Sequence, residues 1–459
     1  MRAAFWTGIG TRFLPFADAA SADLPLTRIL RLSLFQVSVG MTAVLLTGTL
    51  NRVMIVELGM SSALVAIMVA LPLLFAPMRA LIGHKSDTHR SVFGWRRVPY
   101  IWFGSLLQFG GLAIMPFALL VMSGGGAGPA WIGHTGAALA FLLVGAGMHT
   151  TQTAGLALAT DLATADKAPR VVALLYVMLL IGTMVSAVAI GQALADFSAT
   201  RLVQVVSTGA VLTMVFNTVA LWKQEARGAL PRSAAERPAF GDVWAAFVSQ
   251  PDAKRLLLAT GFGAAAFAMQ DVLLEPYGGQ VLGLSVSATT SLTALWALGT
   301  LGGFALAART LTNGGDTHRL AGNGGVAGIG AFLMIIFAAP AQSPTLLALG
   351  AAVLGFGGGL FSVGTLTAAM ALSQSGRSGL ALGAWGAVQA SCAGTAIALG
   401  GILREAFGAG DATTGYTAVY LIEILLLLAT LVAIGPLVGR RARETLIPSQ
   451  RFGLAEFPA

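Results

Sequence analysis

Long apolar runs alternate with short polar segments along the whole chain. Each run is about as long as the 20 apolar residues that a helix needs to cross the hydrocarbon core of a bilayer. The pattern predicts an all-α polytopic membrane protein with twelve transmembrane helices. The runs lie at residues 29–50, 61–82, 98–122, 136–160, 170–194, 201–222, 256–276, 286–308, 321–340, 345–371, 378–403 and 415–438.

The polar segments between the runs carry a strong charge bias. If the N-terminus lies inside, 24 of the 27 Lys and Arg residues fall on the inner side, and only Arg52, Arg201 and Arg404 fall outside. Cytoplasmic loops of membrane proteins carry such an excess of basic residues. We therefore expect a multi-pass protein of a bacterial cytoplasmic membrane with both termini in the cytoplasm.

Composition excludes several classes of function. Only 10% of the residues are charged, whereas an average soluble domain has about 25%, so a water-soluble enzyme is excluded. The net charge of +8 comes from short loops without interleaved aromatic residues, which argues against a nucleic-acid partner. The single cysteine, Cys392, excludes an intrachain disulfide and a cysteine-based zinc site.

The two halves of the chain are related in sequence. Residues 87–90 (DTHR) recur as residues 316–319, and two further short matches lie 224 residues apart. This duplication predicts two pseudo-symmetric six-helix halves, the architecture of the major facilitator fold, with a central site near the bilayer midplane. The expected parts are a cytoplasmic interfacial N-terminal arm at 1–28, an N-terminal bundle at 29–222, a cytoplasmic linker with a short interfacial helix at 223–253, a C-terminal bundle at 254–438 and a cytoplasmic tail at 439–459.

A cluster of charges lies between the second and third runs and resembles the signature loop of major facilitator proteins, with stretched spacing. An acid and several arginines at helix ends can pair with one another and with helix termini across the gap between the halves. We predict a gating or charge clamp here; the alternative is that the charges only set topology. The cluster and its reduced second copy comprise Gly83, Asp87, Arg90, Arg96, Arg97, Asp316 and Arg319.

Four segments together carry a closer resemblance. They are residues 50–58 (LNRVMIVEL), 79–90 (RALIGHKSDTHR), 94–102 (GWRRVPYIW) and 149–161 (HTTQTAGLALATD). In combination and order they resemble the bacteriochlorophyll delivery (PucC/LhaA) family of the major facilitator superfamily. The resemblance implies a non-enzymatic factor in light-harvesting complex assembly, located in the cytoplasmic or intracytoplasmic photosynthetic membrane.

The same resemblance implies cargo and partners. Bacteriochlorophyll would be bound or delivered to the alpha and beta antenna polypeptides, or to nascent core or peripheral complexes, with pigment-synthesis enzymes and membrane lipid as further partners. Two alternatives stay open. One is an ion-coupled secondary transporter of a small solute, and the other is an assembly scaffold that carries no pigment.

Candidate pigment ligands lie in the first and fourth runs. His149 and Gln152 share a helix face at mid-membrane depth, and Gln36 and Asn51 lie on a narrow polar seam of the first run. Intramembrane polar side chains normally face the bundle interior, and a neutral imidazole can ligate the magnesium of a chlorin. For His149 the alternatives are hydrogen bonding between helices and proton transfer.

Acidic residues in the second half define a further candidate. Asp271 and Glu275 lie one turn apart in the seventh run, near the outer face, and Glu275 aligns with Asn51, the neighbour of Arg52. We predict that Arg52 pairs with Asp271 or Glu275 and closes the outer side, because charges beside apolar runs need partners. The alternative is a set of surface charges in a wet vestibule. Glu423, in the last run, is expected to be a lone buried acid.

Overall fold

The computed structural model describes residues 20–21, 24–75, 82, 86, 91, 94–122, 129–164, 167–225, 251–372 and 378–439, and within them all regular structure is helical. The N-terminal half contains α2 (Leu26–Leu32), α3 (Leu34–Ala43), η3 (Val44–Leu50), η4 (Val53–Glu57), α4 (Ser62–Ala70), η5 (Leu71–Phe75), α6 (Val98–Met122), α7 (Ala130–Leu162), α8 (Ala168–Ala193) and α9 (Ala199–Leu221). The C-terminal half contains α11 (Pro251–Met269), η6 (Gln270–Val272), α12 (Leu274–Leu282), α13 (Val286–Thr312), α14 (Thr317–Ala338), α15 (Pro344–Leu372), α16 (Ser378–Phe407), α17 (Ala412–Ile434) and η7 (Gly435–Leu437).

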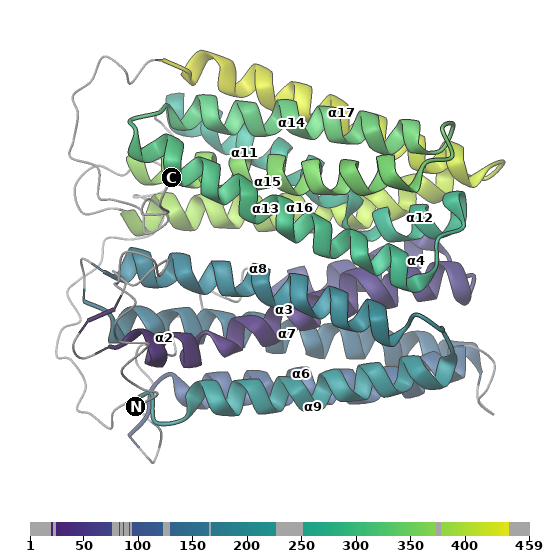
Figure 1. Ribbon diagram of the computed structural model, residues 1–459, viewed down its shortest axis with the longest axis horizontal. Coiled ribbons are helices and arrows are strands. Elements are labelled where there is room, and N and C mark those ends of the chain that lie inside the picture. The colour runs from purple at the N-terminus through teal and green to yellow at the C-terminus, as the bar shows by residue number, and fades with distance from the viewer. Residues whose placement is uncertain are drawn as a thin grey trace, which may run out of the picture.

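The helices run side by side in two bundles, one from each half of the chain (Figure 1). Ten described helices are long and apolar enough to span a membrane, and the bent pair Asp252–Val272 and Leu274–Leu282 makes an eleventh. A shorter apolar helix, Ser62–Leu73, occupies the second predicted run, and residues 76–81 of that run lie outside the described residues. Every predicted run thus contains a helix, which confirms the all-helical, multi-span prediction.

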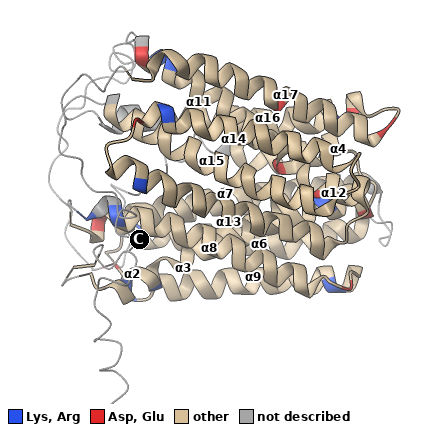
Figure 2. Ribbon diagram, turned by 45° about the horizontal axis from the view of Figure 1, so that its top comes forward, with Lys and Arg blue, Asp and Glu red and all other residues tan. Residues whose placement is uncertain are grey.

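Basic residues gather at one end of the bundle (Figure 2). We call this the basic end; it includes Arg96, Arg97, Arg309 and Arg319, whereas Arg52, Arg201 and Arg404 lie toward the opposite end. This separation agrees with the charge bias of the sequence. The predicted arm and linker helices lie in residues 1–19 and 226–250, and the tail in residues 440–459, all outside the described residues.

Small residues let neighbouring helices approach closely, as expected where lipid supplies no hydrophobic drive for association. Gly299 of α13 and Gly355 of α15 each lie against a backbone carbonyl of the other helix, those of Ala352 and Trp296, with no room for a Cβ atom. Gly324 of α14 has the same relation to Gly357 of α15. Glycine therefore sets the spacing within this half.

The first helix of each half is irregular at equivalent depth. In the N-terminal half, Val44–Leu50 and Val53–Glu57 are wound as π-helix. In the C-terminal half, helix α11 gives way to the 3-10 turn η6 (Gln270–Val272) and resumes as α12, bent by 45°. At the 224-residue offset between the halves, residues 270–272 of this break correspond to residues 46–48 of the π-helical segment. Irregular helices near the midplane commonly mark binding sites in duplicated membrane proteins.

The two bundles pack through α4 against α16 and through α8 against α13. Five hydrogen bonds from residues 51–63 of the first half cross to the second half. Their partners lie at the break of the first C-terminal helix or toward the opposite end, on residues 272, 284, 401 and 405. The halves are therefore held together on the side away from the basic end.

Candidate functional site

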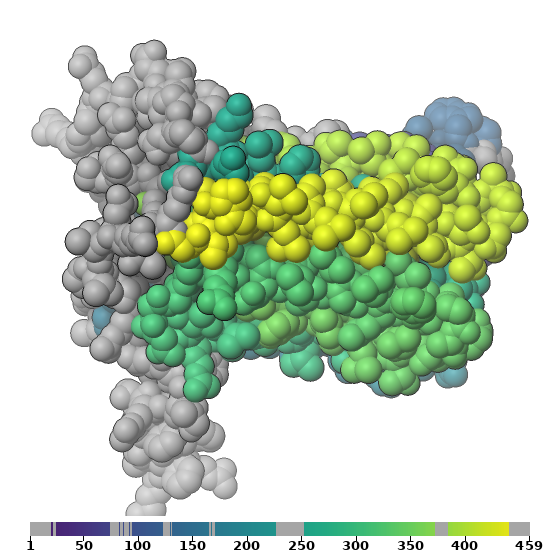
Figure 3. All heavy atoms as spheres, turned by 90° about the horizontal axis from the view of Figure 1, so that it is seen from above, coloured from purple at the N-terminus to yellow at the C-terminus, as the bar shows by residue number. Residues whose placement is uncertain are grey.

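Three carboxyl side chains lie inside the C-terminal half, where its first helix breaks. Asp271 belongs to η6 and Glu275 to the first turn of α12. Glu423 lies midway along α17, a helix that covers one face of the molecule (Figure 3), and its side chain points inward with no exposed surface. The sequence places Asp271 and Glu275 near the outer face, but the helix continues beyond them to Leu282. Both acids consequently lie deeper than expected.

Glu423 is not alone, contrary to the prediction. Its carboxylate approaches the backbone N–H of Gln270 and lies close enough to Asp271 for the two charges to repel each other. Neither oxygen of Glu423 makes a hydrogen bond of ordinary geometry with the described residues. Asp271 accepts a hydrogen bond of 2.5 Å from Nε2 of Gln270. The sequence could not reveal this neighbourhood, because its members lie about 150 residues apart.

Glu275 is held between the halves. Its Oε1 accepts a hydrogen bond of 2.5 Å from Oγ1 of Thr293 on α13. The same oxygen lies against Gly48 of the π-helical segment, where a Cβ atom would collide with it. The carboxylate thus takes the place of a side chain at the contact between η3 and α12.

The predicted ion pair of Arg52 with Asp271 or Glu275 is wrong for this structure. Arg52 pairs with Glu57 instead, because π-helical winding bonds residue i to residue i+5 and brings these two side chains onto one face. Its Nη2 atom donates a hydrogen bond of 3.0 Å to the carbonyl of Leu284 in the other half. Arg52 therefore does join the halves, but through a backbone carbonyl.

A second contact between the halves involves Glu405, which sequence reasoning missed. Its carboxylate accepts hydrogen bonds from the hydroxyl of Ser61 and, at 3.0 Å, from the backbone N–H of Ala63. These groups form the N-terminus of α4, which carries partial positive charge. Glu405 on α16 thus caps a helix of the other half, a role that no local sequence pattern signals.

The polar residues of the N-terminal bundle form two short networks. Gln152 of α7 donates a hydrogen bond of 3.2 Å to Gln36 of α3. Gln108 of α6 donates one of 2.9 Å to Thr151 and accepts a weaker one of 3.4 Å from Thr42. The sequence singled out Gln36 and Gln152 as candidate pigment ligands without predicting this bond, and it did not single out Gln108.

The four candidate pigment ligands do not converge. Gln36 and Gln152 meet, but Asn51 lies about 20 Å farther along the first helix at 1.5 Å per residue, where its Nδ2 donates to the carbonyl of Val272. His149 is 9% exposed and shares a face of α7 with Gly145, which is in tight contact with Pro72.

The charges at the basic end bond within their own half. Asp161, at the end of α7, accepts from Arg97 at 3.0 Å and from Arg96 at 3.4 Å. The carboxylate of Glu225 accepts backbone N–H groups of Arg96, Arg97 and Val98, which begin α6. These hydrogen bonds lie within the N-terminal half and do not cross the gap, and Gly83, Asp87 and Arg90 lie outside the described residues.

The second copy of the motif caps a helix as well. Asp316 accepts backbone N–H groups of His318 and Arg319 at the start of α14 and that of Gly439 after α17. Burial alone would raise the pKa of this carboxyl, but the three N–H donors and the neighbouring His318 outweigh it and lower the pKa. Asp316 therefore favours its charged form in the folded protein.

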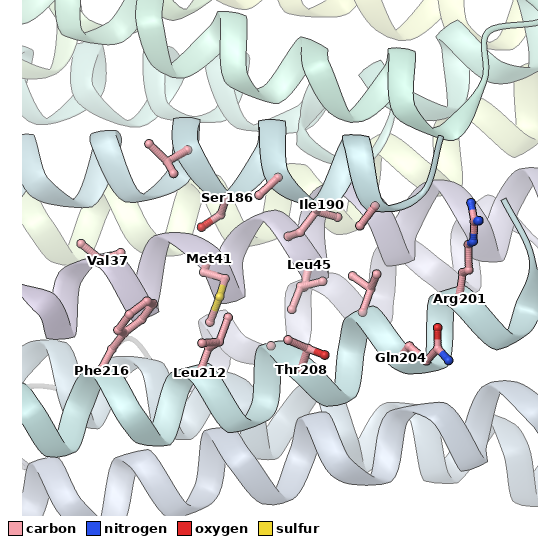
Figure 4. Close-up of a pocket in the computed structure, with 15 residues that line it drawn as sticks. Val37, Met41, Leu45, Ser186, Ile190, Arg201, Gln204, Thr208, Leu212 and Phe216 are labelled. Atoms are coloured by element: carbon pink, nitrogen blue, oxygen red, sulfur yellow. The ribbon is translucent and has the colours of Figure 1, made fainter. Parts of the chain in front are cut away.

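A laterally open groove runs along the N-terminal bundle between α8 and α9, with α3 as its floor (Figure 4). Its volume is about 480 Å³. Met41, Leu45 and Ile190 form the buried floor, the hydroxyls of Ser186 and Thr208 lie along the walls, and Arg201 and Gln204 provide larger polar groups at the opposite end. This groove fits a long apolar chain that enters from the bilayer.

Comparison with known sequences identifies a matching family and several relatives. A family model described as PUCC protein matches residues 49–442. Protein PucC of Rhodovulum sulfidophilum is 58% identical over 87% of this chain and 89% of its own. A protein of Rhodobacter capsulatus described as uncharacterized, in the puhA-bchM intergenic region, is 52% identical over 97% of both chains. A further Rhodobacter capsulatus relative, named bacteriochlorophyll synthase 44.5 kDa chain, is 29% identical over 90% of this chain and 96% of its own.

Several solved structures are similar to this chain in fold. A bacterial homologue of the human lysosomal transporter Spinster has a TM-score of 0.70 at 14% identity, covering 92% of this chain and 98% of that one. A bacterial homologue of the iron transporter ferroportin has a TM-score of 0.66 at 16% identity, covering 90% of this chain and all of that one. At this identity the likeness shows the fold, which is that of major facilitator transporters.

Proposed function

Because the chain belongs to the PUCC protein family, we propose that it is a light-harvesting complex assembly factor that holds bacteriochlorophyll and passes it to antenna polypeptides. The groove between α3, α8 and α9 is the observation that supports this role best. The pigment would enter sideways from the bilayer, and its long apolar tail would lie on the floor of Met41, Leu45 and Ile190. No chemical transformation of the pigment is part of the proposal.

The relatives support the choice of cargo. One relative carries the name of a bacteriochlorophyll synthase chain, and another is described by a puhA-bchM intergenic location. We propose that pigment-synthesis enzymes supply the pigment and that alpha and beta polypeptides of core or peripheral complexes receive it. The protein would be located in a photosynthetic membrane, with both termini in the cytoplasm.

The test of this proposal is a substitution that fills the groove with a large side chain. Thr208 points toward the groove from α9 (Figure 4), and Thr208→Trp would occupy the space of a tail. The protein would be purified in mild detergent from a phototrophic host, and its absorption spectrum and co-eluting polypeptides would be recorded. We expect a chlorin band at a fixed ratio for the unchanged protein and a band reduced several-fold for the variant.

The matched control is Val326→Trp on α14, a lipid-exposed position with 59% of its surface accessible. It adds the same indole far from the groove and should leave the pigment ratio unchanged. An unchanged protein that purifies colourless yet with antenna polypeptides would favour a scaffold without pigment. Equal pigment in Thr208→Trp and Val326→Trp would place the pigment elsewhere.

A secondary transporter of a small solute is the second candidate. The fold of the solved neighbours favours it, as do the partly buried carboxyl of Asp271 and the buried carboxyl of Glu423, because coupled transporters carry ionisable groups inside the membrane. A colourless, solitary monomer in the purification would shift the weight to this function.

A further inference from the structure

The C-terminal half contains a pair of acids that pigment handling does not require, of which Glu423 is fully buried and Asp271 is partly buried. Asp271 and Glu423 come from the first and last helices of this half and meet at the break of the first helix. Among the described residues, neither forms an ion pair with a lysine, arginine or histidine. Two uncompensated negative charges inside a membrane protein would repel each other at high cost.

The hydrogen-bonding groups around the pair indicate which ligand this site would bind. Both oxygens of Glu423 and Oε1 of Gln270 are buried acceptors without a donor in the described structure. Gln270 uses its NH2 group on Asp271, so its orphaned oxygen lies beside the same carboxylate. An excess of buried acceptors over donors is removed by bound protons, each of which turns a carboxylate oxygen into a donor. The described residues contain no group of three acids, histidines or cysteines that could hold a metal ion.

A row of tyrosines leads from the pair toward the opposite end. Tyr420 and Tyr416 precede Glu423 on α17 at intervals of four and three residues, and Tyr277 packs its ring against both, with centroids 5.5 and 5.4 Å apart. The hydroxyl of Tyr416 donates to Gln280 at 2.8 Å, and Arg404 donates to the same oxygen at 2.6 Å. The hydroxyl of Tyr420 is buried without a hydrogen-bond partner among the described residues, and that of Tyr277 donates to the carbonyl of Ile335 at 2.9 Å. The hydrogen bonds in this row therefore join Tyr416, Gln280 and the partly exposed Arg404.

From this arrangement we propose that Asp271 and Glu423 together form a proton-binding site, beside which the row of Tyr420 and Tyr416 extends toward the opposite end of the bundle. The pair shares a proton at neutral pH, which leaves at most one negative charge in the interior. This site goes beyond the proposed function, because binding an apolar pigment in the groove uses neither acid.

Other ionisable groups face the pair from the elements packed around it. The first helix contributes Arg52, which lies next to Glu275 and is already paired with Glu57. Helix α14 contributes charged groups only at the basic end, His318 and Arg319. The groups on α12, α16 and α17 are Glu275, Tyr277, Cys392, Arg404, Glu405, Tyr416 and Tyr420.

Proton binding at the pair would reach the contact between the halves. Val272, which follows Asp271, accepts a hydrogen bond of 2.9 Å from Asn51 of the first half. A proton that arrives at or leaves Asp271 changes the charge next to this bond. The site is therefore placed to bias how firmly the first helices of the two halves hold together.

Infrared spectroscopy of the full-length protein in lipid nanodiscs tests the proposal. We expect the unchanged protein to show the carbonyl band of a protonated carboxylic acid at neutral pH, and the double variant Asp271→Asn, Glu423→Gln to lack it. Asp196→Asn is the control, since the side chain of Asp196 is 89% exposed; it should leave the band unchanged. If the double variant does not fold, 13C labelling of the Asp and Glu carboxyls in the unchanged protein identifies the band instead.

Two results would overturn the proposal. The first is the absence of a protonated carboxyl band from the unchanged protein at neutral pH, or its survival in the folded double variant. The second is loss of the band on replacing choline chloride with sodium chloride at constant pH, which would assign the site to sodium. Because the readout contains no pigment, its failure leaves the proposed function untouched, and a colourless purification leaves this site untouched.

Discussion

Asp316 and Glu225 show how single carboxylates organise the basic end. Each accepts several backbone N–H groups at the start of a helix, α14 for Asp316 and α6 for Glu225. The first helical N–H groups have no partner within their own helix, so such an acceptor stabilises both the turn and the helix dipole. At the residue scale, Asp316, Arg96 and Arg97, which the sequence assigned to a clamp between the halves, thus take part in helix caps.

We predict that Asp316→Ala lowers the free energy of unfolding by about 1 kcal/mol at neutral pH, as loss of an N-cap does. The pKa of Asp316 in the folded protein lies below its ordinary value of 3.8. Its contribution is therefore complete above that value and is lost as the pH falls through the folded pKa. Denaturant unfolding at neutral pH and well below pH 3.8 measures both limits.

Asp196→Ala serves as the comparison for Asp316→Ala, because Asp196 is exposed and its side chain caps no helix. It should change stability little at either pH. A loss for Asp316→Ala that is equally large in acid would mean that packing, rather than the charge of the cap, stabilises this turn.

His149 gives a second prediction at the residue scale. His149 is 9% exposed, whereas the groove beside Thr208 is open to the bilayer. We therefore expect His149→Ala to lower the pigment that co-purifies by less than Thr208→Trp does, as absorption per mole of protein would show. A larger loss for His149→Ala, with the protein still folded, would restore the histidine as the axial ligand of the pigment magnesium.

At the scale of elements, hydropathy predicted where the helices lie but not where they are irregular. The run at 98–122 coincides with α6, and the run at 286–308 with most of α13. The break at η6 contains no glycine or proline, and π-helical winding leaves no periodic signature in composition. The π-helical winding is the reason that Arg52 pairs with Glu57, and the continuation of the first C-terminal helix to Leu282 is the reason that Asp271 lies deeper than the sequence indicated.

Helix spacing in the C-terminal half leads to a prediction for glycine. In Gly299→Ala and in Gly355→Ala, the new Cβ atom would meet a backbone carbonyl of the neighbouring helix. Backbone cannot move aside as a side chain does, so each substitution should cost about 1–3 kcal/mol. The loss would be measured as a lower thermal unfolding midpoint in detergent.

Gly330→Ala is the matched control for these glycines, since a Cβ atom there meets nothing within 4 Å on the same bundle. Alanine is the better helix former, so this variant should be neutral or more stable by up to about 1 kcal/mol. Equal destabilisation by all three substitutions would show that close helix contact is not the reason for glycine at 299 and 355.

At the scale of the whole molecule, the two halves are similar in fold but different in the groups that join them. The first half contributes the guanidinium of Arg52, the amide of Asn51 and the N-terminus of α4; the second contributes backbone carbonyls and Glu405. Duplication in the sequence predicted the two bundles. It could not predict these contacts, because pseudo-symmetric positions have diverged to different residues, as Asn51 and Glu275 have.

A disulfide at this interface separates the two functional candidates. A Cβ atom on Gly191 of α8 would lie 3.7 Å from Oγ of Ser287 on α13, which suits a disulfide. In a Cys392→Ser background, Gly191→Cys with Ser287→Cys should therefore cross-link and lock the opposite end closed. A carrier that alternates access must open that end and would stop. The groove between α3, α8 and α9 lies within one half, so we expect the cross-linked protein to keep its pigment and to support antenna assembly in cells, as measured by whole-cell absorption. Loss of antenna on oxidation, reversed by a reductant, would instead show that assembly requires opening between the halves.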